Sequence, residues 1–460
     1  MVKFIYQNLN AHGGIAMPLS YEPLWHVLRE RNLTKTDLQR LCGVSKATIA
    51  KISKSQPVSL QTLNKLITAL DVSMDQILEV MSNQPAQLSL DLGDDKRTST
   101  GLNTISLFSG AGGLDYGLIK SGFNIIFAND ILKAAVENYR YNIGPIDDRD
   151  ITKINTSELP AADVVVGGFP CQPFSNAGNR LGTDDDRGNL YLELIRIINA
   201  KNPKVVLMEN VRGLLSIKNK DGSKLIDTIV YLLEHAASGY TVTYKLLRAS
   251  DYGVPQNRYR VMIVGIRKDL GFKFEFPKPI KADPKDLTVE HAINIPEGTP
   301  NQDEVWDLSP QSQEIVNNIP EGKSWKAVPY DKLPERLKKI RNNMKRYHSP
   351  NMYRRFARNE INGTITAAAT PEHSGIVHPT ENRRYSVREI ARIQSFPDDY
   401  VFVGDSVSSK YKVIGNAVPP KLAHVVGDAI VSQLRSHGCL SEDTRENTKK
   451  VSTKPIKIFI

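Results

Sequence analysis

Short apolar runs alternate with helix-like segments between Asn103 and Lys268, and this alternation restricts the possible folds more than any other feature. Runs rich in β-branched and aliphatic residues, bounded by glycine or polar residues, are typical of buried strands. We predict strands at 104–107, 125–128, 164–166, 205–208, 241–247 and 260–266. Helical segments lie between most of them, and this order favours an α/β fold with a doubly wound parallel sheet.

The alternation ends after Lys268, and the rest of the chain is organised differently. Residues 271–380 are irregular and rich in proline and charge, and helix-like sequence resumes at Ser386. This predicts a smaller domain inserted before the α/β domain is complete. The predicted organisation is a helical domain at 18–80, a linker at 81–102, the first part of the α/β domain at 103–270, an inserted domain at 271–380, the second part at 381–436 and a tail at 437–460. Residues 1–16 show no periodicity, so Met17 is the more natural start.

The N-terminal domain is predicted to be all-helical, with capping residues that separate its helices. Thr34-Lys35-Thr36-Asp37 starts one helix, Gly43 ends it, and Ser45 starts the next. The segment resembles the small helix-turn-helix domains of phage repressors, whose second helix enters the major groove of DNA. The resemblance implies a recognition helix over 45–53, with DNA-facing side chains at Ser45, Lys46, Thr48 and Lys51. A helical protein-contact or folding appendage is the alternative.

Charge and cysteine content limit the partners and the compartment. The net charge of +10 favours a polyanionic partner, although charge alone does not select nucleic acid. The three cysteines provide neither a disulfide framework nor metal-ligand spacing, which suits a reducing cytoplasm and predicts no metal. No stretch of the sequence is long and apolar enough to suggest a membrane span.

A cysteine framed by prolines follows one of the predicted strands. Asp163-Val164-Val165-Val166 leads into Gly167-Gly168-Phe169-Pro170-Cys171-Gln172-Pro173-Phe174-Ser175. The two glycines allow a sharp turn, and the prolines on either side of Cys171 stiffen the loop. A thiol on a stiff loop at the carboxyl end of a strand is well placed to act as a nucleophile. A buried structural cysteine is the alternative, but it would need no such frame.

A second strand-to-helix turn is rich in glycine. Residues 104–107 are followed by Phe108-Ser109-Gly110-Ala111-Gly112-Gly113, a turn that lets a ligand approach the backbone. Asp130 ends the next predicted strand, where an acid can bind a pair of ribose hydroxyls, and Asp150 can accept from an adenine amino group. Each aspartate alone is more often a cap or a solvated residue. Their placement after successive strands favours a nucleotide-like ligand.

Five further motifs occur in an order that is known from one family. They are Phe108-Ser109-Gly110-Ala111-Gly112-Gly113-Leu114, Glu209-Asn210-Val211, Gln256-Asn257-Arg258-Tyr259-Arg260, Arg388-Glu389-Ile390-Ala391-Arg392 and Gly415-Asn416-Ala417-Val418. With the cysteine loop, they make residues 104–430 resemble the DNA (cytosine-5)-methyltransferases. The resemblance implies a Rossmann-like methyltransferase sheet, an inserted target-recognition domain, and methyl transfer from S-adenosylmethionine to cytosine C5 in duplex DNA.

The same resemblance implies which residues bind S-adenosylmethionine. Phe108, Gly110, Gly112 and Pro170 would line the site, Asp130 would hold the ribose, Asp150 and Ile151 would face the adenine, and Asn416 would close the pocket. The chain departs from the family pattern at three positions. Ser106 replaces an acid, Asp130 is shorter than the usual glutamate, and Ile131 replaces an aromatic residue.

The implied chemistry is covalent catalysis on a cytosine that has been flipped out of the duplex. The Cys171 thiolate would add to C6 and make C5 nucleophilic. Glu209 follows the apolar run 205–208, so burial can raise the pKa of its carboxyl group and let it protonate N3; a helix N-cap is the alternative. Arg258 and Arg260 alternate with Asn257 and Tyr259 at strand period, so both side chains point to one face. A solvated strand edge is the alternative. By resemblance Arg260 contacts the base and Arg258 supports the site. The base that removes the C5 proton is not identified, and water is possible.

A basic run in the predicted inserted domain favours DNA contact. Residues 332–358 hold ten lysines or arginines and one acid, with aromatic residues between them. A solvated charged face is the alternative. The residues expected at DNA are Lys338, Lys339 and Arg341, with Thr364 and Thr366 from a short threonine-rich element. The methylated sequence cannot be derived from these residues.

The expected partners are double-stranded DNA at a target site and at the gene's own promoter. A cognate restriction endonuclease would be a functional partner only, and the protein would methylate as a monomer and repress as a dimer on an operator. Three other functions are consistent with part of the sequence. An RNA cytosine-5 methyltransferase, a DNA-binding regulator with a vestigial methylase fold and a nicotinamide oxidoreductase each explain some motifs. The basic insert opposes the RNA methyltransferase. The intact Cys171, Glu209 and Arg260 oppose the regulator with a vestigial methylase fold. The late Asn416 motif opposes the oxidoreductase.

Overall fold

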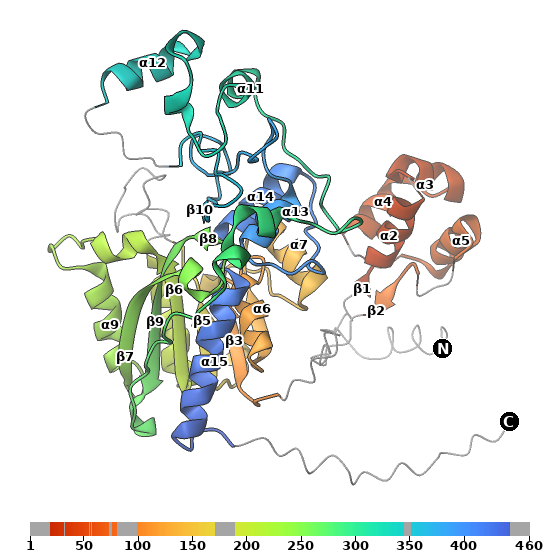
Figure 1. Cartoon of the computed structure of the whole chain (residues 1–460). Helices are drawn as coiled ribbons and strands as arrows, with labels where there is room; N and C mark the ends of the chain where they lie inside the picture. Colours follow the sequence, from red (N-terminus) through yellow and green to blue (C-terminus); the bar gives the residue numbers. More distant parts are fainter. Residues whose placement is uncertain are drawn as a thin grey trace, which may run out of the picture. The chain divides into compact units, whose positions relative to one another are not determined.

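The structure of the chain is a computed structural model (Figure 1). It describes residues 19–441 except 32, 55, 57, 73–75, 81–98, 171–188 and 345–350. The chain divides into two compact units, Met1–Ser89 and Leu90–Ile460, which are described separately. In the part of the chain that the structure describes, no helix has the length and apolar character needed to cross a membrane.

The first unit is a small bundle of helices with its own core. Its elements are β1 (Leu19–Ser20), α2 (Glu22–Glu30), α3 (Lys35–Cys42), α4 (Lys46–Ser53), α5 (Leu60–Leu70) and β2 (Glu79–Val80), and β1 pairs antiparallel with β2. Leu24, Leu38, Ile52 and Leu66 are fully buried at its centre. The predicted helical domain is therefore present, and its two central helices match the predicted motif.

Local sequence explains where these helices start and stop. Thr34 caps α3 through a capping box with Asp37, and Ser45 caps α4 by accepting from the Thr48 amide. Gly43 lies between them with φ of 61°, a left-handed conformation that glycine adopts without strain.

The second unit is built on a six-stranded sheet in the order β4-β3-β5-β6-β9-β7. The strands are β3 (Asn103–Leu107), β4 (Asn124–Asn129), β5 (Val164–Gly167), β6 (Val205–Val211), β7 (Tyr240–Arg248) and β9 (Tyr259–Arg267). All six predicted strands are present. The prediction of a wholly parallel sheet is wrong at β9, which runs antiparallel to both β6 and β7. Residues 249–258, which join β7 to β9, are too short for the crossover that a parallel neighbour requires.

Helices cover both faces of this sheet, as a doubly wound fold requires (Figure 1). Ile105, Val165 and Val206 face a core shared with α8 (Tyr191–Lys201) and α9 (Leu225–His235). The alternate residues of the same strands face a second core shared with α6 (Gly113–Lys120) and α15 (Pro420–Ser436). α15, the last helix in the described part of the chain, thus packs beside α6.

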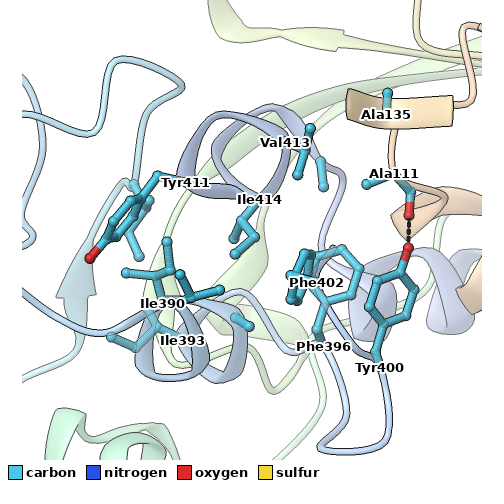
Figure 2. Close-up of a cluster of buried hydrophobic side chains, with 14 of the residues drawn as sticks. Ala111, Ala135, Ile390, Ile393, Phe396, Tyr400, Phe402, Tyr411, Val413 and Ile414 are labelled. Atoms are coloured by element: carbon cyan, nitrogen blue, oxygen red, sulfur yellow. Dashed lines mark hydrogen bonds between the residues drawn. The ribbon is translucent and has the colours of Figure 1, made fainter. Parts of the chain in front are cut away.

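A third core joins segments that are distant in sequence. It contains residues of α7 (Lys133–Asn142), α10 (Val289–Ile293), α13 (Val387–Ile393) and α14 (Val407–Asn416). Figure 2 shows part of it, with Phe396, Tyr400 and Phe402 packed together beside Ala111. This core holds the second part of the α/β domain against the turn that follows β3.

The region predicted as an inserted domain contributes to three cores. Residues of α11 (Pro310–Asn317) and α12 (Glu335–Asn342) pack with Trp325, Tyr353 and Val377 in a core of their own. Phe274 and α10 pack instead with the α/β domain. The short strand β10 (Asn362–Gly363) returns to pair in parallel with β8 (Gln256–Asn257). The boundaries at 271 and 380 stay a prediction.

Candidate active site

The stem of the cysteine loop runs against the end of the neighbouring strand. Cys171 itself lies outside the described residues. β5 pairs with β6 so that Gly167 lies opposite Met208. A Cβ atom added at Gly168 would lie 2.9 Å from Glu209 Oε2, and Asn210 Nδ2 donates to the carbonyl of Phe169 over 3.1 Å. The chain therefore passes directly beside Glu209 three residues before Cys171.

Glu209 and Arg260 form a buried ion pair at this point. Arg260 Nε lies 2.6 Å from Glu209 Oε1, and the two side chains are 8% and 10% exposed. Burial raises the pKa of Glu209, and the positive charges of Arg260 and Arg258 oppose that rise. Arg260 Nη1 donates a hydrogen bond to the carbonyl of Tyr259. A carboxyl group in this environment can hold a proton nearer neutral pH than a surface glutamate and can donate it to a ring nitrogen.

Arg258 has a different environment from Arg260, although it too is buried. It lies between β8 and β9 and donates to three carbonyl oxygens, at distances of 2.6, 2.7 and 3.1 Å: those of Ile365, Gly415 and Ala417. A single guanidinium group therefore joins the threonine-rich element to the end of α14. Arginine suits this position because its planar fork carries five donors.

The threonine-rich element is fixed close to the same arginine. Thr364 Oγ1 donates to the carbonyl of Asn257 over 2.7 Å, and the Thr366 amide donates to Ser374 Oγ over 2.8 Å. A Cβ atom at Gly415 would overlap the carbonyl of Thr366, so α14 and this element touch through backbone. Both threonines are partly exposed.

The turn after β3 holds backbone conformations that are rare outside glycine. Phe108 has φ of 54°, and Gly110 and Gly112 have φ of 59° and 76°. A Cβ atom at Gly112 would overlap Ile143, whereas a Cβ atom at Gly110 would meet no atom of the described residues within 4 Å. Gly110 thus borders open space that a ligand can occupy. Figure 2 shows the Tyr400 hydroxyl bonded to the Ala111 carbonyl, which holds the turn from its other side.

The predicted cofactor acids bond protein groups in this structure. The Asp130 carboxylate accepts from the amides of Gly110 and Leu132, both over 2.8 Å, and burial raises its pKa. Asp150 accepts from the amide and hydroxyl of Thr152, so it caps the short 3-10 helix Ile151–Lys153. The capping alternative that the sequence left open is thus the contact seen here.

The remaining predicted cofactor residues lie around the same sheet edge. The Ile151 side chain belongs to the core, so only its backbone can face a ligand. Pro170 is half-buried at the end of the described stem, and Asn416 is exposed at the end of α14. Ile131 is 63% exposed directly after Asp130 and offers an apolar surface. Open space at Gly110 and this apolar surface fit a nucleoside-like cofactor.

Two buried residues were not given a role from sequence. Asn210 tethers the cysteine-loop stem, and Gln256 accepts from the Ile365 amide while donating to Gln394. The sequence pattern that could have indicated a role for Asn210 is a polar residue at the end of an apolar strand. The partners of Gln256 are more than 100 residues away in sequence, and no local pattern indicated them.

The basic run separates into exposed and engaged cations. Lys339 is exposed on α12. Lys338 pairs with Glu335 over 2.9 Å, and Arg341 donates to the carbonyl of Val328 over 3.0 Å. Arg355 is buried and bonds several carbonyls of its own core. Part of the run is therefore structural.

The predicted recognition helix presents two exposed lysines. Lys46 and Lys51 of α4 are exposed, and so is Ser45 before the helix. Ser45 and Thr48 bond each other over 2.9 Å as part of the helix cap. The two lysines therefore have the longest side chains among the predicted DNA contacts on this helix.

Comparison with known proteins identifies the family. The family model for C-5 cytosine-specific DNA methylases matches residues 102–432, which is most of the chain. The chain belongs to the C-5 cytosine-specific DNA methylases. A model for Cro/C1-type helix-turn-helix DNA-binding domains matches residues 23–82 of this methylase.

Curated relatives of the methylase are named type II methyltransferases. It is 40% identical to the type II methyltransferase M.NgoFVII of Neisseria gonorrhoeae over 69% of its length and 83% of that protein. It is 35% identical to M.MthTI of Methanothermobacter thermautotrophicus over 72% of its length and 98% of that protein. The fold is similar to that of a putative DNA modification methyltransferase of an E. coli prophage, with a TM-score of 0.52, 24% identity and coverage of 73% and 99% of the two chains. The Rossmann-like methyltransferase fold is therefore confirmed.

Proposed function

We propose that this methylase transfers a methyl group from S-adenosylmethionine to C5 of a flipped-out cytosine in a specific duplex sequence, through a covalent Cys171 adduct. One observation carries the proposal. The stem that leads to Cys171 passes beside Glu209, which is buried and paired with Arg260. The path of this stem and the raised pKa of Glu209 support a nucleophile and a proton donor that act together, as covalent catalysis on a pyrimidine requires.

The residues of the chain divide the chemistry between them. The Cys171 thiolate forms a bond to C6, and Glu209 donates its proton to N3, so the ring becomes a nucleophile at C5. Arg260 holds Glu209 in place and is the candidate contact to the base oxygen. S-adenosylmethionine supplies an electrophilic methyl group when it is bound. A base then removes the C5 proton, the C6–sulfur bond breaks, the thiolate leaves with its electron pair, and N3 returns its proton to the Glu209 carboxylate.

The cofactor is proposed to lie along the turn after β3. Gly110 borders the open space there, and Phe108 and Gly112 complete the turn. Asp130, Asp150, Ile151, Pro170 and Asn416 are the proposed surrounding contacts. The bonds from the Asp130 carboxylate to Gly110 and Leu132 favour a shared role, in which this acid fixes the turn and offers a remaining lone pair to the ribose.

Target DNA is proposed to contact the threonine-rich element and the α12 region. Thr364 and Thr366 adjoin the Arg258 junction. Lys339 is the best-supported phosphate contact because it is exposed, whereas Lys338 and Arg341 already bond protein groups. Phosphate contacts of this kind position DNA without reading its sequence.

Bisulfite sequencing of plasmid DNA from cells that express the chain tests the activity and finds the target sequence. DNA with 5-fluorocytosine at that target tests the mechanism, because fluorine cannot leave as the proton does. Wild type, Cys42→Ala and Cys439→Ala should each form a complex stable to denaturing electrophoresis, and Cys171→Ala should not. Methylation only at cytosine N4, at adenine N6 or in RNA contradicts the proposal. Plasmid modified in this way should also resist a type II endonuclease that cuts the same sequence.

A second proposed function is repression of the methylase's own promoter by the helix-turn-helix unit. The exposed Lys46 and Lys51 on α4 and the Cro/C1-type match favour DNA binding. We propose a dimer on a two-fold operator, as such motifs commonly bind. Footprinting of the full chain on its upstream DNA should show a protected site that Lys46→Glu with Lys51→Glu removes, while methylation persists. Absence of any protected site contradicts this function and leaves the methylase proposal intact.

A further inference from the structure

A buried carboxylate lies beneath the turn after β3 and takes no part in the chemistry proposed above. Asp115 is in the first turn of α6 and has no exposed surface. Its Oδ1 accepts from Ser106 Oγ over 2.7 Å, and its Oδ2 accepts from the Tyr139 hydroxyl over 2.7 Å. Ser109, which belongs to the turn itself, donates to Ser106 Oγ over 2.9 Å. A chain of hydrogen bonds thus links the turn to this carboxylate.

No cation of the described part of the chain pairs with Asp115. The titratable groups that act on it are Tyr139 from α7 and Tyr400 from the segment between α13 and α14. Burial raises the pKa of both tyrosines above their ordinary value, so both are neutral near pH 7. Burial also raises the pKa of Asp115 to about 6, and the hydroxyl donors oppose that rise. Asp115 is therefore mostly ionised at neutral pH, without a counter-ion among the described residues.

An unpaired buried charge opposes folding, so its presence needs a reason. The same turn is strained at Phe108 and open to a ligand at Gly110. S-adenosylmethionine carries a positive sulfonium, and its product S-adenosylhomocysteine is a neutral sulfide. Charges attract over several ångströms in a dry protein interior. The negative charge beneath the turn therefore attracts the sulfonium of the cofactor and does not attract the neutral sulfide of the product.

We propose that Asp115 is a positioning residue that fixes the cofactor turn and favours the sulfonium cofactor over its neutral product. The proposal rests on S-adenosylmethionine being the cofactor, as proposed above. Compared with a neutral residue at this position, the charge of Asp115 raises the affinity for the cofactor more than the affinity for the product. Ser106, Ser109 and Tyr139 orient the carboxylate and connect it to the turn.

Calorimetric titration of the full chain with each of the two ligands tests this inference without a turnover assay. Wild type should bind S-adenosylmethionine more tightly, relative to S-adenosylhomocysteine, at pH 7.5 than at pH 5.5, by a factor on the order of fivefold. Asp115→Asn keeps the shape but removes the charge. In this variant the affinity ratio should be lower at pH 7.5 and equal at the two pH values.

Tyr139→Phe is the matched variant that keeps the charge and removes one donor. It should retain the preference at pH 8 and move the midpoint of its pH dependence upward, because the Asp115 carboxylate loses a stabilising hydrogen bond. If thermal melting shows that Asp115→Asn is unfolded, the upward shift of the pH midpoint in Tyr139→Phe tests the inference instead.

An equal effect of Asp115→Asn on both ligands would overturn the inference, as would a wild-type ratio that does not change with pH. Failure of wild type to bind either ligand would instead overturn the proposed cofactor. The two failures are therefore distinguishable.

Discussion

Replacing Glu209 by glutamine separates the structural role of the buried ion pair from its chemical role. Glu209→Gln leaves the Arg260 guanidinium buried without its carboxylate, which lay 2.6 Å away. Both side chains are about nine-tenths buried, so solvent cannot replace the lost partner. Breaking a buried pair of this kind costs about 3–5 kcal/mol. With a urea m-value of about 3 kcal/mol/M, the unfolding midpoint should fall by about 1 M or more.

The same substitution should also slow methyl transfer. A glutamine amide cannot donate a proton to cytosine N3, and loss of a general acid lowers the rate by about 10²–10⁴-fold. The assay is single-turnover transfer of labelled methyl to a duplex that contains the target, at a temperature where urea curves show the variant to be folded. The double variant Glu209→Gln with Arg260→Met removes the stranded charge. It should recover most of the stability and none of the rate.

A surface pair provides the matched control. Arg149 lies 2.8 Å from Glu158, and both side chains are nearly half exposed. Glu158→Gln should change stability far less than Glu209→Gln does and leave the rate unchanged, because solvent screens an exposed pair. If Glu209→Gln shifts the midpoint no more than Glu158→Gln does, the buried-pair reasoning is wrong. If its rate stays within about threefold of wild type, Glu209 is not the proton donor.

Three further predictions concern other parts of the molecule. Gly113→Ala would place a Cβ atom on the carbonyl of Val418, so thermal unfolding should show a loss of about 1–3 kcal/mol, and wild-type stability would contradict the packing seen here. The folded-state pKa of Asp115, about 6, is above the unfolded value of 3.8, so its ionisation penalty grows as pH rises through this range. Relative to wild type, Asp115→Asn should therefore gain about 3 kcal/mol between pH 3.8 and pH 7 in urea unfolding, and a constant difference would refute the shift. Lys339→Glu should weaken binding to all duplexes and reduce the salt slope by about 1, and an unchanged slope would make Lys339 a solvated surface residue.

Features set by local pattern could be predicted from the sequence. Apolar runs such as Val205–Met208 marked the strands, and Thr34 and Ser45 marked helix starts, because capping and strand burial depend on neighbouring residues. The direction of β9 could not be predicted in this way. A buried antiparallel strand carries the same apolar run as a parallel one, and only the short connection after β7 distinguishes them.

Contacts between distant segments were also beyond the sequence. The carbonyl partners of Arg258 lie more than 100 residues further along the chain, so its role as a junction needed the structure. The basic run illustrates another limit, which is that composition does not predict which charged residues are exposed. Composition could not separate the exposed Lys339 from the buried Arg355, because identical charges serve solvent or a core according to tertiary position.

The pairing of α15 with α6 sets an order of events during synthesis. α6 packs against α15, the last helix in the described part of the chain, so the catalytic domain cannot close until residue 436 has left the ribosome. The first unit has a complete core within residues 21–77 and can fold long before that. At about 5–20 residues per second, the interval is about 20–70 s. Protease digestion of pulse-labelled nascent chains should therefore yield a resistant N-terminal fragment first. During each round of translation, the DNA-binding unit is finished while the methylase is still incomplete.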